Sequence, residues 1–396
     1  MRNKIRSLIL ILLFSSLLTN CTIKSSKEST IVTGADQTEK YIPYLKGKNV
    51  AMTMNQSSII GNKLSMDSLI SSGIKVVKVF GPEHGFRGNA SDGATIENDT
   101  DIKTGVSIIS LYGIYNKPTK EDLSGVDIMI FDIQDVGVRF YTFLSTLHYV
   151  MEACAENNVE LIVLDRPNPN DSYVDGPIRE ENFKSFVGTD PIPIVHGMTF
   201  GEYAMMVNGE GWLENKVKCN LRVIEMLNYK HGKPYLLPMP PSPNLNTQQS
   251  ILLYPSLCLF EGTEISQGRG TYFPFQVLGN PELKGKYSFS FTPESIKGMS
   301  EHPPQLNLEC YGLDLRNYDI NKFKESGRIN LGWLIEFYNA YPFKEKFFNS
   351  YFEDLAGTDK LRKQIIAGKT EKEIQDSWEP GLTQYKNTRM KYLIYK

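Results

Sequence analysis

Short apolar runs separated by segments with helical spacing dominate the first half of the chain. The runs cover residues 49–56, 76–80, 106–112, 126–132 and 160–165. Such near-continuous apolar character is typical of strands buried on both faces of a parallel sheet. The order predicts an α/β, Rossmann-like domain with its ligand site beyond the carboxyl ends of the strands. Helices are expected at residues 64–71, 119–123 and 142–157.

The alternation of apolar runs and helical segments ends near residue 234, where a proline-rich connector begins. We therefore expect a Rossmann-like parallel-sheet domain over residues 41–233 and a smaller α+β C-terminal domain over residues 234–396. In the second domain, apolar alternation predicts strands at 286–291 and 306–315, and helical spacing predicts helices at 331–341 and 361–367.

The first 21 residues differ from the rest of the chain. Three basic residues precede a short apolar run at 8–14, as in a signal peptide, and the run is too short for a membrane span. The ending Leu-Thr-Asn-Cys resembles a bacterial lipobox, which implies cleavage before Cys21 and its lipidation. A plain secretory signal is the alternative. Either reading predicts a protein of the bacterial cell envelope, periplasm-facing if lipidated, with residues 22–40 as a flexible tether.

Composition excludes several classes of function. The net charge of −2 gives no basic excess for nucleic acid. Neither a G-x-G-x-x-G turn nor a Walker A motif is present, so no nucleotide cofactor is expected. The cysteines after Cys21 are far apart and lack metal-ligand spacing, which argues against a disulfide framework and a structural zinc. We therefore expect no cofactor and no metal.

The second apolar run ends at Gly-Pro and is followed by Glu83 and His84. A carboxylate and an imidazole at the carboxyl end of a buried strand lie where α/β proteins bind their ligands. Glu83 is therefore the first candidate for a catalytic group. The alternative is a solvated loop glutamate beside a histidine that fills a turn.

A second polar cluster follows the run at 126–132. It contains Asp132, Gln134, Asp135, Arg139 and Tyr141. Strand alternation places the first two on one side and the third at the turn. The alternative is structural: the third residue caps the following helix and the arginine forms an ion pair.

The fifth run ends in Asp165 and Arg166, followed by two prolines on a rigid loop. These two residues are either part of the same site or a mutual salt bridge that shapes the loop. His196 follows a further apolar segment and can donate to a sugar hydroxyl or a carboxylate. Thr199 and Glu202 have the spacing of a capping box, so the glutamate is expected to be structural.

In the C-terminal half, Glu261, Glu264 and Arg269 form a polar loop with two glycines. The arginine can bind a carboxylate with two parallel hydrogen bonds. Neither a G-x-S-x-G elbow nor an H-E-x-x-H motif is present. Many carboxylates and few histidines favour acid–base chemistry, and glycoside hydrolysis is the reaction class that needs two carboxyl groups.

These motifs together resemble one known family, the exo-β-N-acetylmuramidases. The resemblance is carried by residues 81–88, 131–142, 164–169, 261–263 and 268–271. It implies a Rossmann-like domain joined to a smaller domain, with the active cleft between them. It also implies hydrolysis of terminal β-1,4-linked N-acetylmuramic acid from the non-reducing ends of peptidoglycan fragments, without metal or nucleotide.

The resemblance implies roles for individual residues. Glu83 would be general acid or base, and His84 would be a further catalytic residue of the cleft. Asp135 is the favoured second carboxylate, with Asp132 and Glu264 as alternatives. The expected substrate-binding residues are Asp132, Gln134, Arg139, Tyr141, Asp165, Arg166, His196, Glu264 and Arg269. Arg139 or Arg269 would pair with the lactyl carboxylate of muramic acid.

The expected partners are a peptidoglycan-derived glycan and, through the N-terminal lipid alone, the membrane. Residues 89–104 would form a mobile rim loop. The competing function is a non-catalytic periplasmic lipoprotein that binds a sugar or muropeptide.

Overall fold

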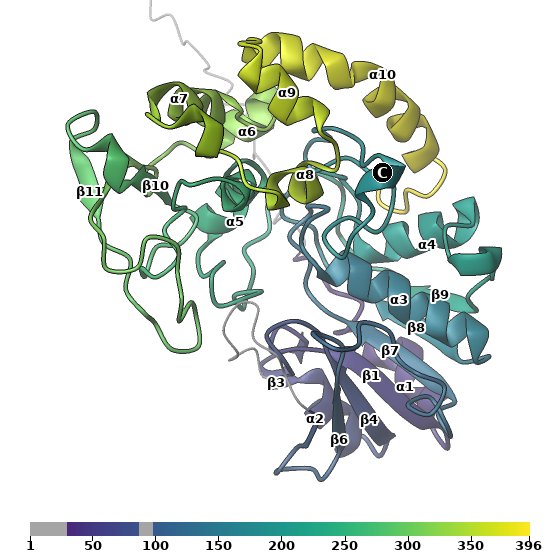
Figure 1. The fold of residues 1–396 in the computed structure, drawn as a ribbon. Helices are drawn as coiled ribbons and strands as arrows, with labels where there is room; N and C mark the ends of the chain where they lie inside the picture. The colour runs from purple at the N-terminus through teal and green to yellow at the C-terminus, as the bar shows by residue number, and fades with distance from the viewer. Residues whose placement is uncertain (1–29, 87–97) are drawn as a thin grey trace, which may run out of the picture. The chain divides into compact units, whose positions relative to one another are not determined.

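The computed structural model describes residues 30–86 and 98–396 (Figure 1). The expected signal peptide, the lipidation of Cys21 and most of the tether lie outside the described residues, as does much of the expected rim loop. Among the helices of the described part, none has both the length and the apolar character needed to cross a membrane.

A seven-stranded sheet forms the core of the N-terminal half. Its neighbouring strands are parallel except at one edge, where β5 runs antiparallel to β6. The order β6-β4-β1-β7-β8-β9 is that of a doubly wound sheet and confirms the expected fold class. The strands are, across the sheet, β5 (Asp99–Thr100), β6 (Ser107–Ser110), β4 (Lys75–Gly81), β1 (Asn49–Met54), β7 (Ile128–Asp132), β8 (Glu160–Leu164) and β9 (Leu221–Ile224).

Both faces of this sheet are covered because successive side chains point to opposite sides. Ala51 and Phe131 pack against α3 (Phe143–Glu156) and α4 (Phe200–Glu210). Val50 and its alternating neighbours pack against the other pair of helices, α1 (Thr38–Leu45) and α2 (Ser65–Ser71). Figure 1 shows α3 and α4 together on one side of the strands. Helix α4 begins with the expected capping box of Thr199 and Glu202.

Two segments differ from expectation. Residues 119–123 form a turn in place of a helix, because the Asp122 carboxylate accepts hydrogen bonds from Thr119 N and Oγ1 and closes the turn locally. The described end of the expected tether is folded onto the sheet: Gly34 N donates to Asp165 O at 2.8 Å, and Tyr41 of α1 is fully buried.

The C-terminal half contains helices around a three-stranded antiparallel sheet of order β10-β12-β11. Its apolar residues join the same hydrophobic cluster as the α3 face of the large sheet, so the core is continuous. Helix α10, the longest described helix, was not expected. The elements are α5 (Gln248–Leu257), β10 (Val277–Asn280), β11 (Phe289–Phe291), β12 (Cys310–Asp314), α6 (Asn321–Ser326), α7 (Gly332–Ala340), α8 (Tyr351–Ala356), α9 (Lys360–Ile366) and α10 (Glu371–Arg389).

Two smaller features complete the fold. A short hairpin of β2 (Ile59–Ile60) and β3 (Lys63–Leu64) precedes α2. The four cysteines of the described residues are buried and unpaired, which agrees with small apolar roles in the core.

Candidate active site

A cavity of about 280 Å³ lies beyond the carboxyl ends of β4 and β7. Its wall combines the loop after β4, the start of α3, the end of α5 and the start of α8. The polar and aromatic lining residues are Glu83, His84, Tyr112, Phe140, Tyr141, Thr142, Ser185, Phe186, Ser242, Asn244, Tyr254, Glu261, Arg269, Phe275, Tyr351 and Asp354. Both halves of the chain therefore contribute to one cavity.

The turn after β4 presents Glu83 and His84 to this cavity. Strand β4 ends at Gly81, where a Cβ would lie only 3.0 Å from Phe86 N, and Gly85 N donates to Pro82 O at 2.9 Å to close the turn. His84 has φ 68° and Gly85 φ 77°, so two successive residues lie in the left-handed region. A non-glycine residue in this region costs conformational energy, and such strain concentrates at functional sites.

The carboxylate of Glu83 accepts a hydrogen bond from another residue of the cavity lining. Thr142 Oγ1 donates to Glu83 Oε2 at 2.7 Å, and Thr142 is the residue that precedes α3. Burial raises the pKa of the neighbouring Tyr141 well above its usual value, and the charges of Glu83 and Asp135 raise it further. Tyr141 therefore stays a neutral phenol in the cavity wall.

Arg269 enters the cavity from the C-terminal half. Its Nε and Nη2 donate to Glu261 Oε1 at 2.9 and 2.6 Å, and its guanidinium lies 5.1 Å from the ring centre of Phe275. The ion pair and the cation–π contact fix the side chain, so the guanidinium is preorganised for an anionic ligand. Gly268 and Gly270, with φ 84° and 79°, allow the tight loop that delivers it.

Three acidic side chains line the cavity: Glu83, Glu261 and Asp354. The second is paired with Arg269. Burial raises the pKa of Asp354 above its usual value, and the nearby charge of Glu353 raises it further. The cavity therefore offers several carboxyl groups in different electrostatic environments, as acid–base chemistry needs.

Several expected site residues lie outside this lining and are bonded within the protein. Asp132 and Arg166 form a buried ion pair at 2.7 Å, so the alternative pairing of Arg166 with its neighbour Asp165 is not what the structure shows. Asp165 instead accepts from Thr199 Oγ1 and Tyr395 Oη, both at 2.7 Å. Burial raises the pKa of Asp165 to about 7, although these hydrogen bonds oppose the shift.

Arg139 and Gln134 have structural partners. Arg139 is 2% exposed and donates to the backbone oxygens of Pro177, Ile192 and Leu355. Gln134 Nε2 donates to backbone oxygens of two loops. Because neither side chain lines the cavity, the expectation that Arg139 meets the lactyl carboxylate is not supported by its position.

Asp135 and His196 form a buried pair, and neither residue lines the cavity. His196 Nδ1 accepts from Met198 N at 3.2 Å, so its Nε2 carries the proton and faces Asp135 Oδ2 at 3.3 Å. Asp135 does not cap α3, because Thr142 holds that position. Neither Asp135 nor Glu264 lines the cavity, in contrast to Glu83, His84, Tyr141 and Arg269.

Other lining residues were missed by sequence reasoning. Thr142 is the last residue of the motif at 131–142 and stands where a helix is expected to begin. Nothing in the local sequence indicates that its hydroxyl bonds the carboxylate of Glu83. Tyr351 and Asp354 belong to a six-residue helix with no local motif. Long-range folding alone brings them to Glu83, so only a structure reveals them.

The comparisons with known proteins agree over most of the chain. The family model for the N-terminal part of exo-beta-N-acetylmuramidase NamZ matches residues 50–249, and the model for its C-terminal part matches residues 252–395. The Bacillus subtilis (strain 168) peptidoglycan beta-N-acetylmuramidase NamZ is 38% identical over 400 residues, which cover 94% of this chain and 93% of that protein.

Solved structures give the same result. A DUF1343 family protein from Bacteroides fragilis NCTC 9343 is 47% identical, with a TM-score of 0.86 over 93% of this chain and 99% of its own. A second such protein from the same organism is 28% identical, with a TM-score of 0.80 over 92% of this chain and 99% of its own. With both family models matched in order, the chain belongs to the exo-β-N-acetylmuramidase NamZ family.

Proposed function

We propose that this protein is an exo-acting glycosidase that releases terminal β-1,4-linked N-acetylmuramic acid from the non-reducing ends of peptidoglycan fragments. The full-length match to the NamZ family carries the proposal. The cavity supports it, because Glu83 on the turn after β4 lines the same cavity as Arg269 and Asp354.

In this mechanism Glu83 is the general acid. Its proton passes to the glycosidic oxygen as the bond between that oxygen and the anomeric carbon breaks. The Thr142 hydroxyl, 2.7 Å from Glu83 Oε2, orients the carboxyl group. A second carboxylate either takes a proton from the attacking water or attacks the anomeric carbon itself.

We propose Glu261 or Asp354 as the second carboxylate in place of Asp135, because these two residues line the cavity and Asp135 does not. Substituting each by its amide separates the two. Loss of turnover in Asp354→Asn, with Glu261→Gln affecting mainly KM, assigns the role to Asp354, and the reverse pattern assigns it to Glu261.

Arg269 is the group proposed to recognise the lactyl carboxylate of muramic acid. Its guanidinium is fixed by Glu261 and Phe275 and lies in the cavity wall. A planar guanidinium binds a carboxylate with two parallel hydrogen bonds. This contact would distinguish muramic acid from glucosamine, which lacks the lactyl group.

The cell envelope is the proposed location, with Cys21 as a lipidated anchor. The support is the basic and apolar leader that ends in Leu-Thr-Asn-Cys. Labelling cells with an alkyne fatty acid tests this: wild type incorporates the label and Cys21→Ser does not. Equal labelling of wild type and Cys21→Ser would contradict lipidation of Cys21.

The activity is tested with the disaccharide in which N-acetylmuramic acid is β-1,4-linked to N-acetylglucosamine. Release of free N-acetylmuramic acid by wild type and its collapse in Glu83→Gln support both the reaction and the role of Glu83. A folded wild type that binds the disaccharide without releasing the sugar would instead be the binding lipoprotein.

A further inference from the structure

The cavity of the candidate active site has a buried end and an open end. Phe140, Tyr254 and Phe275 line it with at most 7% of their surface exposed. Phe186, which is partly exposed, and Tyr351, which is 38% exposed, line the same cavity. An enzyme that removes one terminal sugar encloses that sugar and leaves the rest of the glycan on the open side. The residues of the open end are therefore placed to meet the leaving part of the substrate.

A tight turn presents Phe186 at the open end. Gly188 N donates to Ser185 O at 3.0 Å and Ser185 N donates to Gly188 O at 3.3 Å, so the two residues between them form the tip. Thr189 Oγ1 donates to Ser145 Oγ of α3 at 2.6 Å and anchors the turn to this helix. A side chain at the tip of an anchored turn has a defined place in the cavity wall.

Two neighbouring rings fix the ring of Phe186. Tyr149 of α3 stacks on it, with 6.3 Å between the ring centres and 8° between the planes. Tyr112, which also lines the cavity, lies 6.0 Å away at 50°. Phe186 has no polar side-chain atom, so it contributes an apolar ring surface and no acid–base chemistry. A β-linked pyranose with equatorial substituents carries axial C–H groups on its faces, and these pack against an aromatic ring.

Tyr351 adds a polar group to the same end of the cavity. Its hydroxyl has no hydrogen-bond partner among the described residues. Although part of the ring is exposed, burial of the hydroxyl raises its pKa above the usual value, and the charges of Glu261, Cys258 and Glu83 raise it further. These three residues line the cavity, so the hydroxyl lies on the cavity side and stays protonated. A neutral phenol can donate to a sugar hydroxyl or to the carbonyl of an N-acetyl group.

We propose that Phe186 and Tyr351 bind the leaving sugar, the N-acetylglucosamine to which the terminal muramic acid is linked. Phe186 packs against one face of this sugar, and Tyr351 donates a hydrogen bond to one of its oxygens. The two residues thereby select a glycan as leaving group over a simple alcohol. The assignment rests on the proposed function, because a leaving sugar exists only where the protein cleaves a glycosidic bond.

The test measures kcat/KM with two substrates that share the muramic acid. One is the disaccharide with N-acetylglucosamine, and the other is the methyl β-glycoside of N-acetylmuramic acid, which has no leaving sugar. Phe186→Leu removes the ring, Phe186→Tyr keeps it, and Tyr351→Phe removes the hydroxyl alone. The matched control is Phe343→Leu, because this ring is 43% exposed and lies 6.0 Å from the ring of Tyr341, outside the cavity lining. Thermal unfolding identifies the variants that fold.

Phe186→Leu and Tyr351→Phe should each lower kcat/KM for the disaccharide by about 3- to 10-fold and leave the methyl glycoside nearly unchanged. Phe186→Tyr and Phe343→Leu should match wild type with both substrates. Unchanged turnover of the disaccharide, or equal losses with both substrates, would overturn the proposal, and a loss in one variant alone would overturn the role of the other residue. Failure of the proposed function looks different, because wild type itself would then release no N-acetylmuramic acid.

Discussion

Thr142 Oγ1 donates a hydrogen bond of 2.7 Å to Glu83 Oε2 and thereby joins the start of α3 to the turn after β4. The carboxyl group is held by an element that begins sixty residues later in the chain, not by its own turn. A hydrogen bond from the start of a helix restricts the rotamers of a catalytic side chain that lies on a loop.

Thr142→Val should therefore lower kcat/KM for the disaccharide by about tenfold, equivalent to about 1.4 kcal/mol of transition-state stabilisation. Valine keeps the shape and removes the donor. The matched control is Thr146→Val, one turn later in α3, where the hydroxyl bonds only to the backbone of Thr142. Equal activity of Thr142→Val and wild type would show that the hydrogen bond does not position Glu83.

Arg269→Met should raise KM for muramic acid substrates by roughly 10- to 100-fold, because about 1.5–3 kcal/mol is typical of hydrogen bonds to charged groups. A glucosamine analogue without the lactyl group should show little change. Arg316→Met is the control: this arginine also pairs with a carboxylate and lies over an aromatic ring, but it is 43% exposed and outside the cavity. The same KM change with both substrates would contradict lactyl recognition.

Arg139→Met should reduce the free energy of unfolding by about 2–4 kcal/mol, since three backbone oxygens lose a charged donor. Denaturant titration measures this loss. KM of the remaining folded enzyme should be unchanged, and Arg222→Met at the surface should leave stability nearly as in wild type. A specific rise in KM without loss of stability would restore Arg139 to the substrate site.

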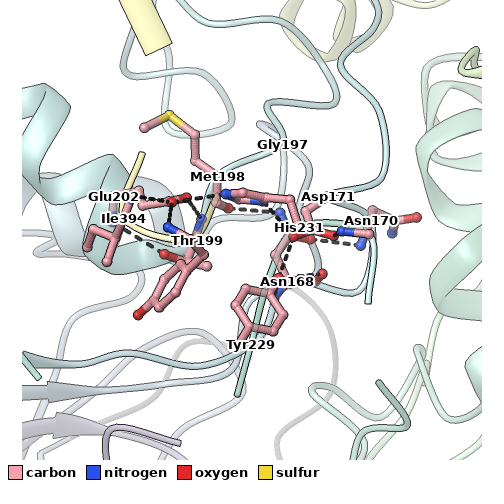
Figure 2. Close-up of polar contacts among 12 residues, drawn as sticks. Asn168, Asn170, Asp171, Gly197, Met198, Thr199, Glu202, Tyr229, His231 and Ile394 are labelled. Carbon is pink, nitrogen blue, oxygen red and sulfur yellow. Dashed lines mark hydrogen bonds and ion pairs between the residues drawn. The ribbon is translucent and has the colours of Figure 1, made fainter. Parts of the chain in front are cut away.

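His231 gives stability a defined pH dependence. Burial alone would lower its pKa, but hydrogen bonds with Asp171 and Glu202 raise it to about 9 (Figure 2). The folded protein thus holds the proton more tightly than the unfolded chain, whose histidine has a pKa near 6.5. The stabilisation is fully present below about pH 6.5 and is lost as pH rises through 9.

His231→Gln should accordingly cost about 2 kcal/mol at pH 6 and much less at pH 9.5, because one pKa unit corresponds to about 1.4 kcal/mol and solvent screens part of the interaction. Urea unfolding at several pH values measures the difference from wild type. His302→Gln, at an exposed position, is the control. A pH-independent difference would show that packing, not the proton, is what His231 contributes.

The centre of the large sheet could be predicted because β1, β7 and β8 are buried along nearly their whole length and consist mostly of apolar residues. The edge strand β9 was not predicted from the sequence. Leu221 and Val223 are only partly buried, and the exposed Arg222 between them interrupts the apolar run. Helix α10 was also not predicted from the sequence. Ile374, Trp378 and Leu382 have helical spacing, but Pro380 lies between them and proline normally interrupts a helix.

The candidate site could be predicted only in part. Sequence reasoning located Glu83, His84, Tyr141 and Arg269, which follow glycine-rich turns at the cavity. The sequence did not distinguish these cavity residues from charged residues at neighbouring strand ends whose side chains are buried and bonded within the protein. Asp132 finds its partner Arg166 34 positions later, and no local pattern reports such a pairing.

The bond from Tyr395 to Asp165 spans 230 positions of the chain. At the usual translation rate of about 5–20 residues per second, roughly 10 to 50 s separate the synthesis of these two residues. Throughout that interval the end of β8 lacks one of its hydrogen-bond donors, and α4 lacks the backbone groups of Ile394 and Tyr395 that donate to Glu202. The nascent chain therefore completes the hydrogen bonds at the carboxyl end of β8 and at the start of α4 only after Tyr395 has been synthesised.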